Sequence, residues 1–234
     1  IPEETARRAK FIYINYPNNP TGAVATKAFY EKLVAWAKTY EVGVVSDLAY
    51  GALGYRGYEN PSFLSTPGAK DVGIEFYTFS KTFNMAGWRL AFAAGNDQMI
   101  EALNLIQDHL FVGIFPALQE AGIAALLDPK SEEAVAQLNA TYDSRRDAFV
   151  QAAAKIGWKA FPSKGSFYAW MPVPEGYTSE SFADLLLAKA HVAVAPGKGF
   201  GPAGDAYVRI GLLVEPERLV EAVNRIADLH LFDN

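Results

Sequence analysis

The 234-residue sequence contains no cysteine, which excludes disulfide bonds, thiolate catalysis and sulfur-ligated metals together. Its three histidines are scattered and make a poor metal-binding set. No apolar run approaches the roughly 20 residues of a transmembrane helix, and the first residues do not resemble a signal peptide. The formal charge of -5 offers no basic surface to a nucleic acid. We therefore expect a soluble globular protein, naturally cytoplasmic, that binds neither membrane nor nucleic acid.

Short apolar runs alternate with stretches of helical period, and this alternation is typical of the α/β class. The first strand is predicted at 11–14 and a helix at 27–40, with Thr26 as its N-cap. The run at 42–45 is typical of a buried parallel strand. The buried face of the helix is predicted to comprise Phe29, Leu33, Val34 and Ala37.

The remaining elements are predicted from the same patterns. Further strands are expected at 76–79, 90–93, 167–170, 192–195 and 207–212. Further helices are expected at 98–110, 118–127, 131–156, 179–190 and 216–229. Asp128-Pro129-Lys130 interrupts the helical pattern. We accordingly divide the chain into a large domain, 1–128, and a smaller α+β domain, 129–234.

Polar side chains follow the first two strands of the predicted sheet. Asp47 lies just past the strand at 42–45, and Asn19 lies in a turn after the first strand. Because the carboxyl ends of parallel strands meet at one edge of a sheet, both side chains could reach one ligand. Tyr50 has a spacing from Asp47 that allows it to face the same ligand. The alternatives are a turn or N-cap aspartate, a simple turn at Asn19 and a packed aromatic at Tyr50.

A second cluster lies at the end of the strand at 76–79 and in the loop that follows; it comprises Thr78, Ser80, Lys81 and Arg89. Two hydroxyls and a guanidinium suit a phosphate dianion, and the lysine adds a movable positive charge. A solvated basic loop is the alternative.

Arg209 alternates with Val208 and Ile210 in a predicted strand, so it projects from the opposite face. A strand arginine flanked by apolar residues is rarely left unpaired when buried. It could form a structural ion pair or bind a substrate carboxylate. The glycine-rich segment 197–201 matches neither phosphate-loop pattern, so we interpret it as a tight loop.

In this order, the motifs resemble the class I/II aminotransferase family of fold-type I pyridoxal-phosphate enzymes. The residues that carry the resemblance are Asn19-Pro20-Thr21-Gly22, Asp47 with Tyr50, Ser80-Lys81 leading to Gly87 and Arg89, and Arg209. The resemblance covers nearly the whole chain, and 16–23 and 80–89 look most like bacterial methionine-salvage, diaminopimelate and alanine aminotransferases. It implies a mostly parallel sheet with flanking helices, a smaller α+β domain and a homodimeric full-length enzyme.

The resemblance also implies roles for individual residues. Lys81 would carry pyridoxal 5'-phosphate as a Schiff base and move the substrate's α-proton. Asp47 would keep the pyridine nitrogen protonated, and Tyr50 and Asn19 would hydrogen-bond the phenolic oxygen. The phosphate would be bound by Thr78, Ser80 and Arg89, and the α-carboxylate of an amino-acid or 2-oxo-acid substrate by Arg209 assisted by Asn19.

The sequence departs from the family pattern at Thr78, where Ser or Gly is usual, although a hydroxyl remains. Two other functions fit the same scaffold. One is different pyridoxal-phosphate chemistry, such as a cysteine-S-conjugate β-lyase, and the other is the effector-sensing domain of a transcription regulator. Transamination is the function we expect.

The Asn19 motif follows the first strand here, whereas in this family it comes well into the chain. Full members carry upstream an arm, a glycine-rich phosphate-binding turn and an aromatic that stacks on the pyridine ring, and none has a counterpart here. We therefore expect a shortened or proteolysed form that is inactive as a transaminase. It would leave apolar sheet surface uncovered and associate through it.

Overall fold

The computed structural model describes residues 1–161 and 163–232 and contains two compact units. The first unit comprises Ile1–Pro17, Val24–Gly54 and Glu59–Gln137. The second comprises Asn18–Ala23, Tyr55–Tyr58 and the chain from Leu138 onward. The units are therefore interleaved in sequence, because the loops 18–23 and 55–58 pack with the later part of the chain.

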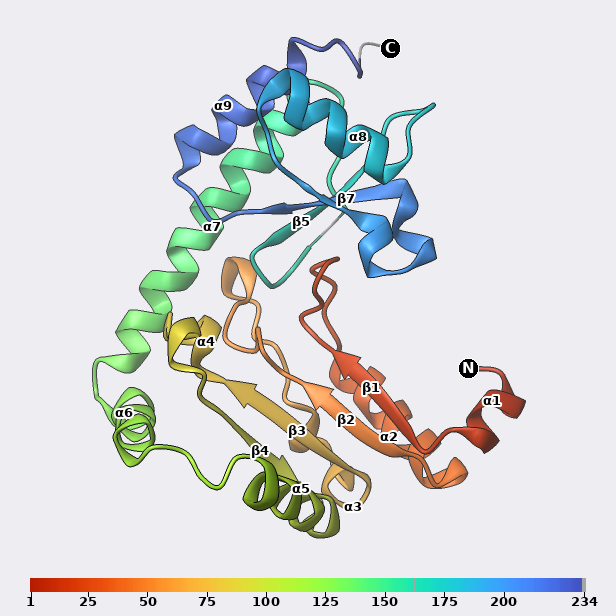
Figure 1. The fold of residues 1–234 in the computed structure, drawn as a ribbon, viewed down its shortest axis with the longest axis vertical. Coiled ribbons are helices and arrows are strands. Elements are labelled where there is room, and N and C mark those ends of the chain that lie inside the picture. Colours follow the sequence, from red (N-terminus) through yellow and green to blue (C-terminus); the bar gives the residue numbers. More distant parts are fainter. Residues whose placement is uncertain (162, 233–234) are drawn as a thin grey trace. The chain divides into compact units, whose positions relative to one another are not determined.

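The first unit alternates strands and helices in chain order (Figure 1). Its elements are α1 (Glu3–Arg8), β1 (Phe11–Asn15), α2 (Lys27–Tyr40), β2 (Gly43–Asp47), α3 (Ala69–Val72), β3 (Gly73–Thr78), α4 (Phe79–Thr82), β4 (Ala91–Gly95), α5 (Asp97–Leu110) and α6 (Pro116–Leu127). The 25-residue helix α7 (Ser131–Lys155) begins in this unit and continues into the second. Among the described helices, none is both long and apolar enough to cross a membrane.

The sheet of the first unit has the order β1-β2-β3-β4. β2 pairs in parallel with β1 and β3, whereas β4 runs antiparallel to β3. In register, Asp47 lies opposite Asn15 on one side and Phe76 on the other. The carboxyl ends of β1, β2 and β3 therefore share one edge, where ligands of open α/β sheets bind.

Helix α2 has the predicted bounds, and the side chain of Thr26 caps it by accepting a hydrogen bond from the Phe29 N–H. Its buried face contains Tyr30, Leu33, Val34 and Ala37. The prediction that Phe29 belongs to this face is wrong, because Phe29 is 38% exposed and Tyr30 packs edge-on against Phe63 instead. The packing partner lies 33 positions later in the chain, so helical period alone does not distinguish the two aromatics.

A buried carboxylate ties β3 to its surroundings. Glu75 is 6% exposed and accepts hydrogen bonds from Ser46 Oγ at 3.0 Å and from the Phe63 N–H at 2.8 Å. Several donors satisfy the carboxylate, which a buried charge requires. The contacts hold Ser46, and with it the end of β2, in place next to Asp47.

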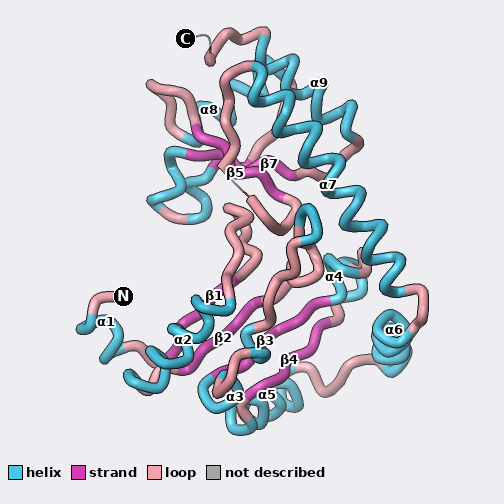
Figure 2. The backbone as a smooth tube through the Cα atoms, turned by 180° about the vertical axis from the view of Figure 1, so that it is seen from behind, coloured by secondary structure: helices cyan, strands magenta, loops and turns pink. Residues whose placement is uncertain are grey.

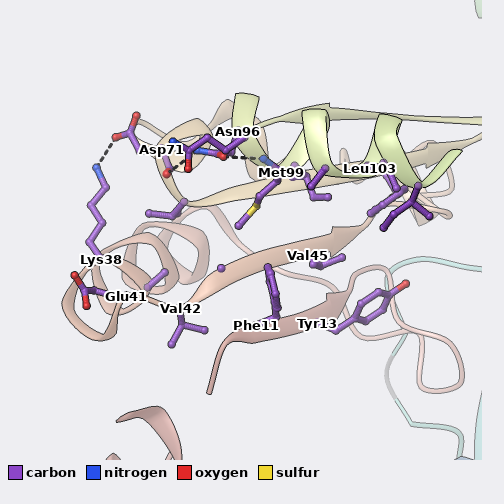
Figure 3. Close-up of a pocket in the computed structure, with 18 residues that line it drawn as sticks. Phe11, Tyr13, Lys38, Glu41, Val42, Val45, Asp71, Asn96, Met99 and Leu103 are labelled. Carbon is purple, nitrogen blue, oxygen red and sulfur yellow. Dashed lines mark hydrogen bonds and ion pairs between the residues drawn. The ribbon is translucent and has the colours of Figure 1, made fainter. Parts of the chain in front are cut away.

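An apolar groove of about 890 Å³ lies on one face of this sheet. Figure 3 shows Met99 and Leu103 of α5 above the strands that carry Phe11, Tyr13 and Val45. Phe11 and Tyr13 are 60% and 64% exposed. The lining does not include Lys81 or Arg89, so the groove is distinct from the phosphate cluster predicted from sequence.

The second unit has a three-stranded antiparallel sheet of order β5-β7-β6. Its elements are β5 (Tyr168–Pro172), α8 (Ser179–Leu185), β6 (Ala195–Pro196), β7 (Tyr207–Gly211) and α9 (Pro216–Ala227), besides the later part of α7. Two predictions need correction. The strand at 192–195 pairs only at Ala195–Pro196, and the helix predicted at 179–190 ends in a π-helical turn, Leu186–Ala190.

Helices α7, α8 and α9 pack against the sheet of the second unit, as Figure 2 illustrates. Their side chains form one core with Met171 of β5 and with Val208 and Ile210 of β7. Because side chains alternate along a strand, Arg209 projects from the other face, as predicted.

Candidate active site

Asp47 ends β2 and is held from several directions. Its Oδ1 accepts a hydrogen bond from the Ala49 N–H at 3.0 Å, and its Oδ2 accepts one from the Tyr13 hydroxyl at 2.8 Å. Asn15 Nδ2 donates to the Asp47 main-chain oxygen at 3.0 Å. The contact with Ala49 is the turn interaction that a strand-end aspartate often makes. The contact with Tyr13 fixes the carboxylate orientation, and each oxygen retains a second lone pair for a ligand.

Tyr13 was not among the residues expected from sequence. It lies two positions before Asn15 in β1, so it shares a face with Asn15 and faces β2. Although much of the side chain is exposed, partial burial of the phenol, and then the hydrogen bond and negative charge of Asp47, raise the pKa of Tyr13 to about 12. The phenol therefore remains a donor to Asp47 at neutral pH.

We expect Asp47→Asn to lower the pKa of Tyr13, because the carboxylate favours the protonated phenol. The fall should be partial, since burial is the largest cause of the raised pKa and remains. The measurement is the phenolate absorbance titration of this chain minus that of Tyr13→Phe, made with Asp47 and with Asn at position 47. A Tyr13 pKa that is the same in both backgrounds would contradict the contact.

The segment that carries Lys81 starts where β3 ends. Thr78 caps α4, with its hydroxyl accepting from the Ser80 N–H at 3.2 Å and donating to Ser80 Oγ at 2.9 Å. Phe79 and Thr82 are buried, and Lys81 lies half-buried between them. The two hydroxyls and the lysine are thus brought together by one short turn.

Apolar packing holds this turn in place. Phe79, Met85 and Leu90 form a small core, with side chains from α6 packed against it. Gly122 of α6 allows the close approach, because a Cβ there would lie 2.7 Å from Leu90 Cδ2. Packing against α6 therefore holds the turn that carries Lys81.

Arg89 and Tyr50 are the remaining residues of the first unit that were predicted to bind the cofactor. Arg89 is exposed, has the left-handed φ of 54°, and donates through Nη1 to the Ala86 carbonyl at 2.9 Å. Its guanidinium is thus oriented by its own loop while facing solvent. Tyr50 is 5% exposed and lies in the turn after β2, three residues from Asp47.

The second unit brings Asn19 and Arg209 together. Arg209 Nη1 donates to Asn19 Oδ1 at 2.7 Å. The guanidinium carbon lies 4.2 Å from the ring centre of Tyr168 and 4.7 Å from that of Phe200. Within residues 1–161 and 163–232 no carboxylate forms an ion pair with Arg209, so the structural ion pair considered from sequence is not found. Arg209 is half-buried, and Asn19, Tyr168 and Phe200 surround its guanidinium.

The turn that presents Asn19 is fixed by its neighbours. Asn18 Oδ1 accepts from the Thr21 N–H at 3.2 Å and from the Thr21 hydroxyl at 2.8 Å. Gly22 has a φ of 69°, and a Cβ there would lie 2.1 Å from Ser163 Oγ. Glycine is required at this position for both reasons. The Asn19 side chain is thus presented to Arg209, from which its Oδ1 accepts a hydrogen bond.

The chemistry of these groups fits an aldehyde cofactor that carries a phosphate. In the first unit, hydroxyls at Thr78 and Ser80 and the guanidinium of Arg89 suit a phosphate dianion. An amine at Lys81 can bond to a carbonyl carbon, and the oriented carboxylate of Asp47 suits a protonated ring nitrogen. The donor set therefore fits pyridoxal phosphate.

Named relatives are similar over almost the entire chain. The L-glutamine--4-(methylsulfanyl)-2-oxobutanoate aminotransferase of Bacillus subtilis is 57% identical over 232 residues, which cover 99% of this chain and 58% of that protein. The LL-diaminopimelate aminotransferase of Moorella thermoacetica is 49% identical over 226 residues, covering 97% of this chain and 57% of that protein. The chain thus spans somewhat over half the length of these relatives.

Solved structures share the fold. Substrate-bound BacF from Bacillus subtilis superposes with a TM-score of 0.93 at 47% identity, covering 99% of this chain and 58% of that one. An aminotransferase from Staphylococcus aureus superposes with a TM-score of 0.95 at 40% identity, covering 99% and 61%. The expected fold-type I architecture is confirmed. The family model for aminotransferase class I and II matches residues 1–226, and members of that family use pyridoxal phosphate. The chain therefore belongs to the class I and II aminotransferase family.

Proposed function

We propose that the full-length enzyme, meaning the protein at the length of its relatives, transfers an amino group between an amino acid and a 2-oxo acid with pyridoxal phosphate. The observation that carries the proposal lies at the edge of the first unit's sheet. There Lys81 directly follows the Thr78–Ser80 hydroxyl pair at the end of β3, and Asp47 ends the adjacent parallel strand β2. The first unit would belong to the cofactor-binding domain, and the second would be the small domain.

The residues of the first unit would bind and orient the cofactor. Thr78, Ser80 and Arg89 would bind its phosphate, with the 2.9 Å hydroxyl contact placing two oxygens side by side. Asp47 would accept a hydrogen bond from the protonated pyridine nitrogen, its own orientation being fixed by Tyr13. Tyr50 would donate to the phenolic oxygen, for which Asn19 is the further donor implied by the family resemblance.

Proton transfer would be the task of Lys81. When bound, pyridoxal phosphate supplies a ring that accepts the electron pair left by the substrate's α-proton. Lys81 Nζ would take this proton from the α-carbon and return it to the adjacent cofactor carbon. The Arg209 guanidinium would bind the substrate's α-carboxylate through a forked pair of hydrogen bonds, with Asn19 assisting as the family resemblance implies.

The choice of substrate is proposed from similarity. The 57% identity to the Bacillus subtilis enzyme supports 4-(methylsulfanyl)-2-oxobutanoate as acceptor and L-glutamine as donor. The 49% identity to the LL-diaminopimelate aminotransferase of Moorella thermoacetica supports LL-diaminopimelate as an alternative substrate. We favour L-glutamine and 4-(methylsulfanyl)-2-oxobutanoate, because the identity to the Bacillus subtilis enzyme is higher over a similar number of residues.

The test is a product analysis of the full-length enzyme with pyridoxal phosphate, L-glutamine and 4-(methylsulfanyl)-2-oxobutanoate. Methionine formed in equal amount to the glutamine consumed would support transamination. Ammonia and pyruvate from a cysteine S-conjugate, without amino transfer, would instead establish the β-lyase reaction. Binding of pyridoxal phosphate with neither reaction would favour a sensing domain.

We also propose a cytoplasmic homodimer. Exposed apolar side chains cluster between α5 and α6, and larger patches of this kind mark interaction surfaces. They are Leu110 (69% exposed), Phe111 (70%), Val112 (87%) and Phe115 (68%).

Phe111→Glu in the full-length enzyme is expected to raise the dimer dissociation constant, because it would place a charge in an apolar interface. Sedimentation equilibrium measures the constant, with Leu187→Glu at an exposed apolar position of the second unit as control. Equal constants for the two variants would show that Phe111 lies outside the interface.

A further inference from the structure

The glycine-rich segment 197–201 has no part in the proposed chemistry, yet it is built for close contact. Gly197–Phe200 forms a 3-10 turn, and Pro202–Ala206 forms the next one. A Cβ at Gly197 would lie 2.2 Å from the Gly204 carbonyl oxygen, and a Cβ at Gly204 would lie 2.1 Å from that of Gly197. The two turns therefore pack backbone to backbone, which only glycine permits at these positions.

Side-chain contacts fix the place of the turn on the second unit. The Lys198 N–H donates to Ser179 Oγ at 3.2 Å, and Lys198 Nζ lies 2.6 Å from Glu180 Oε2. Ser179 is fully buried and also donates through its hydroxyl to Asp205 Oδ1 at 2.8 Å. The turn is thus attached to the start of α8 and to the following turn, and its last residue has a defined position.

That last residue is Phe200, which reaches the guanidinium of Arg209. Its ring centre lies 4.7 Å from the guanidinium carbon, while Tyr168 approaches to 4.2 Å. Phe200 also packs edge-on against Trp170, which stacks on Tyr207 at 5.2 Å. Phe200 nevertheless remains 42% exposed. Phe200 is therefore not a core residue, although its ring contacts both Arg209 and Trp170.

Two rings against a guanidinium limit where it can bind a partner. Aromatic faces attract the cation through its π surface, whereas its N–H donors lie in the guanidinium plane. One of these donors, on Nη1, is already directed to Asn19 Oδ1. The donors that remain for a ligand are in-plane ones, and this is the geometry that a carboxylate needs for a forked hydrogen bond.

We propose that Phe200 is a positioning residue for Arg209, and that segment 197–201 exists to place its ring there. This proposal rests on the proposed role of Arg209 in binding the substrate carboxylate. Phe200 and Tyr168 together hold the guanidinium in the plane that a carboxylate must enter. Loss of the Phe200 ring would then weaken carboxylate binding while leaving cofactor binding and proton transfer unchanged.

The test compares Phe200→Leu with Phe161→Leu in the full-length enzyme. Phe161 is also in the second unit, is 43% exposed and makes no ring contact with Arg209. The probe is 4-(methylsulfanyl)butanoate, an unreactive acid whose dissociation constant is measured by calorimetry. Phe200→Leu is expected to raise this constant about three- to tenfold, as a cation–π contact of about 1 kcal/mol predicts. The constant for pyridoxal phosphate and kcat should stay within about twofold, and Phe200→Tyr should restore acid binding.

The outcomes separate this proposal from the one it rests on. Arg209→Lys should weaken the acid more than Phe200→Leu does, since an ammonium cannot reproduce the guanidinium fork. If Arg209→Lys leaves both the acid constant and KM unchanged, the proposed role of Arg209 fails. If Arg209→Lys weakens the acid but Phe200→Leu behaves like Phe161→Leu, only the positioning proposal is overturned. Joint loss of kcat, cofactor affinity and melting temperature in Phe200→Leu would likewise overturn it in favour of a structural role.

Discussion

Replacing Lys81 with alanine in the full-length enzyme is expected to reduce transamination by at least about 10³-fold, because one amine serves as both tether and proton carrier. The fold should persist, since Lys81 is half-buried and the turn around it is anchored by Phe79 and Thr82 instead. The measurement is kcat with saturating substrates, together with the far-ultraviolet circular dichroism spectrum. Lys32→Ala, at an exposed position on α2 in the same unit, is the matched control.

Two further observations would identify the lysine directly. Borohydride treatment followed by peptide mass spectrometry should find the cofactor's mass on the peptide that contains Lys81 and not in Lys81→Ala. Added methylamine should restore part of the proton transfer in Lys81→Ala, since a small amine can occupy the vacated space and act as the base. Residual activity above a few per cent without added amine would contradict the assignment of Lys81.

Replacing Asp47 with asparagine is expected to have the second largest effect. The neutral amide cannot stabilise a protonated pyridine nitrogen, so α-proton removal should slow by roughly 10²-fold or more. Bound cofactor should be retained, because Thr78, Ser80, Lys81 and Arg89 do not depend on this carboxylate. The rate of exchange of the substrate's α-deuterium with solvent measures the step.

The control for Asp47 is Asp71→Asn. Asp71 is a carboxylate of the same unit that forms an exposed 2.7 Å ion pair with Lys38. Exposed pairs of this kind contribute little to stability, so this variant should exchange at the wild-type rate. Equal exchange rates in the two variants would mean that Asp47 has no part in α-proton removal. Its role would then be structural, as a turn residue that accepts a hydrogen bond from the Ala49 N–H.

Local patterns predicted much of the fold. The bounds of α2, its Thr26 cap and the parallel strands on either side depend on nearby residues, and the structure confirms them. The predictions at Phe29 and at the strand 192–195 were wrong. Which of two adjacent aromatics is buried depends on Phe63, and the length of β6 depends on how far β7 runs beside it. Both partners are distant in sequence.

The sequence by itself determined the family and the candidate site residues. The order of Asn19, Asp47, Lys81, Arg89 and Arg209 was sufficient, because each motif is a short run of chemically distinct side chains. Only the tertiary structure decided which contacts fix the positions of these side chains. The hydroxyl of Tyr13 meets Asp47 because β1 and β2 pair in register, and Arg209 meets Asn19 across 190 positions of the chain. The rings of Tyr168 and Phe200 lie against Arg209 because a strand face and a glycine-anchored turn bring them there. Contacts of this kind depend on pairing and packing between distant segments, which the periodicity of a single segment does not encode.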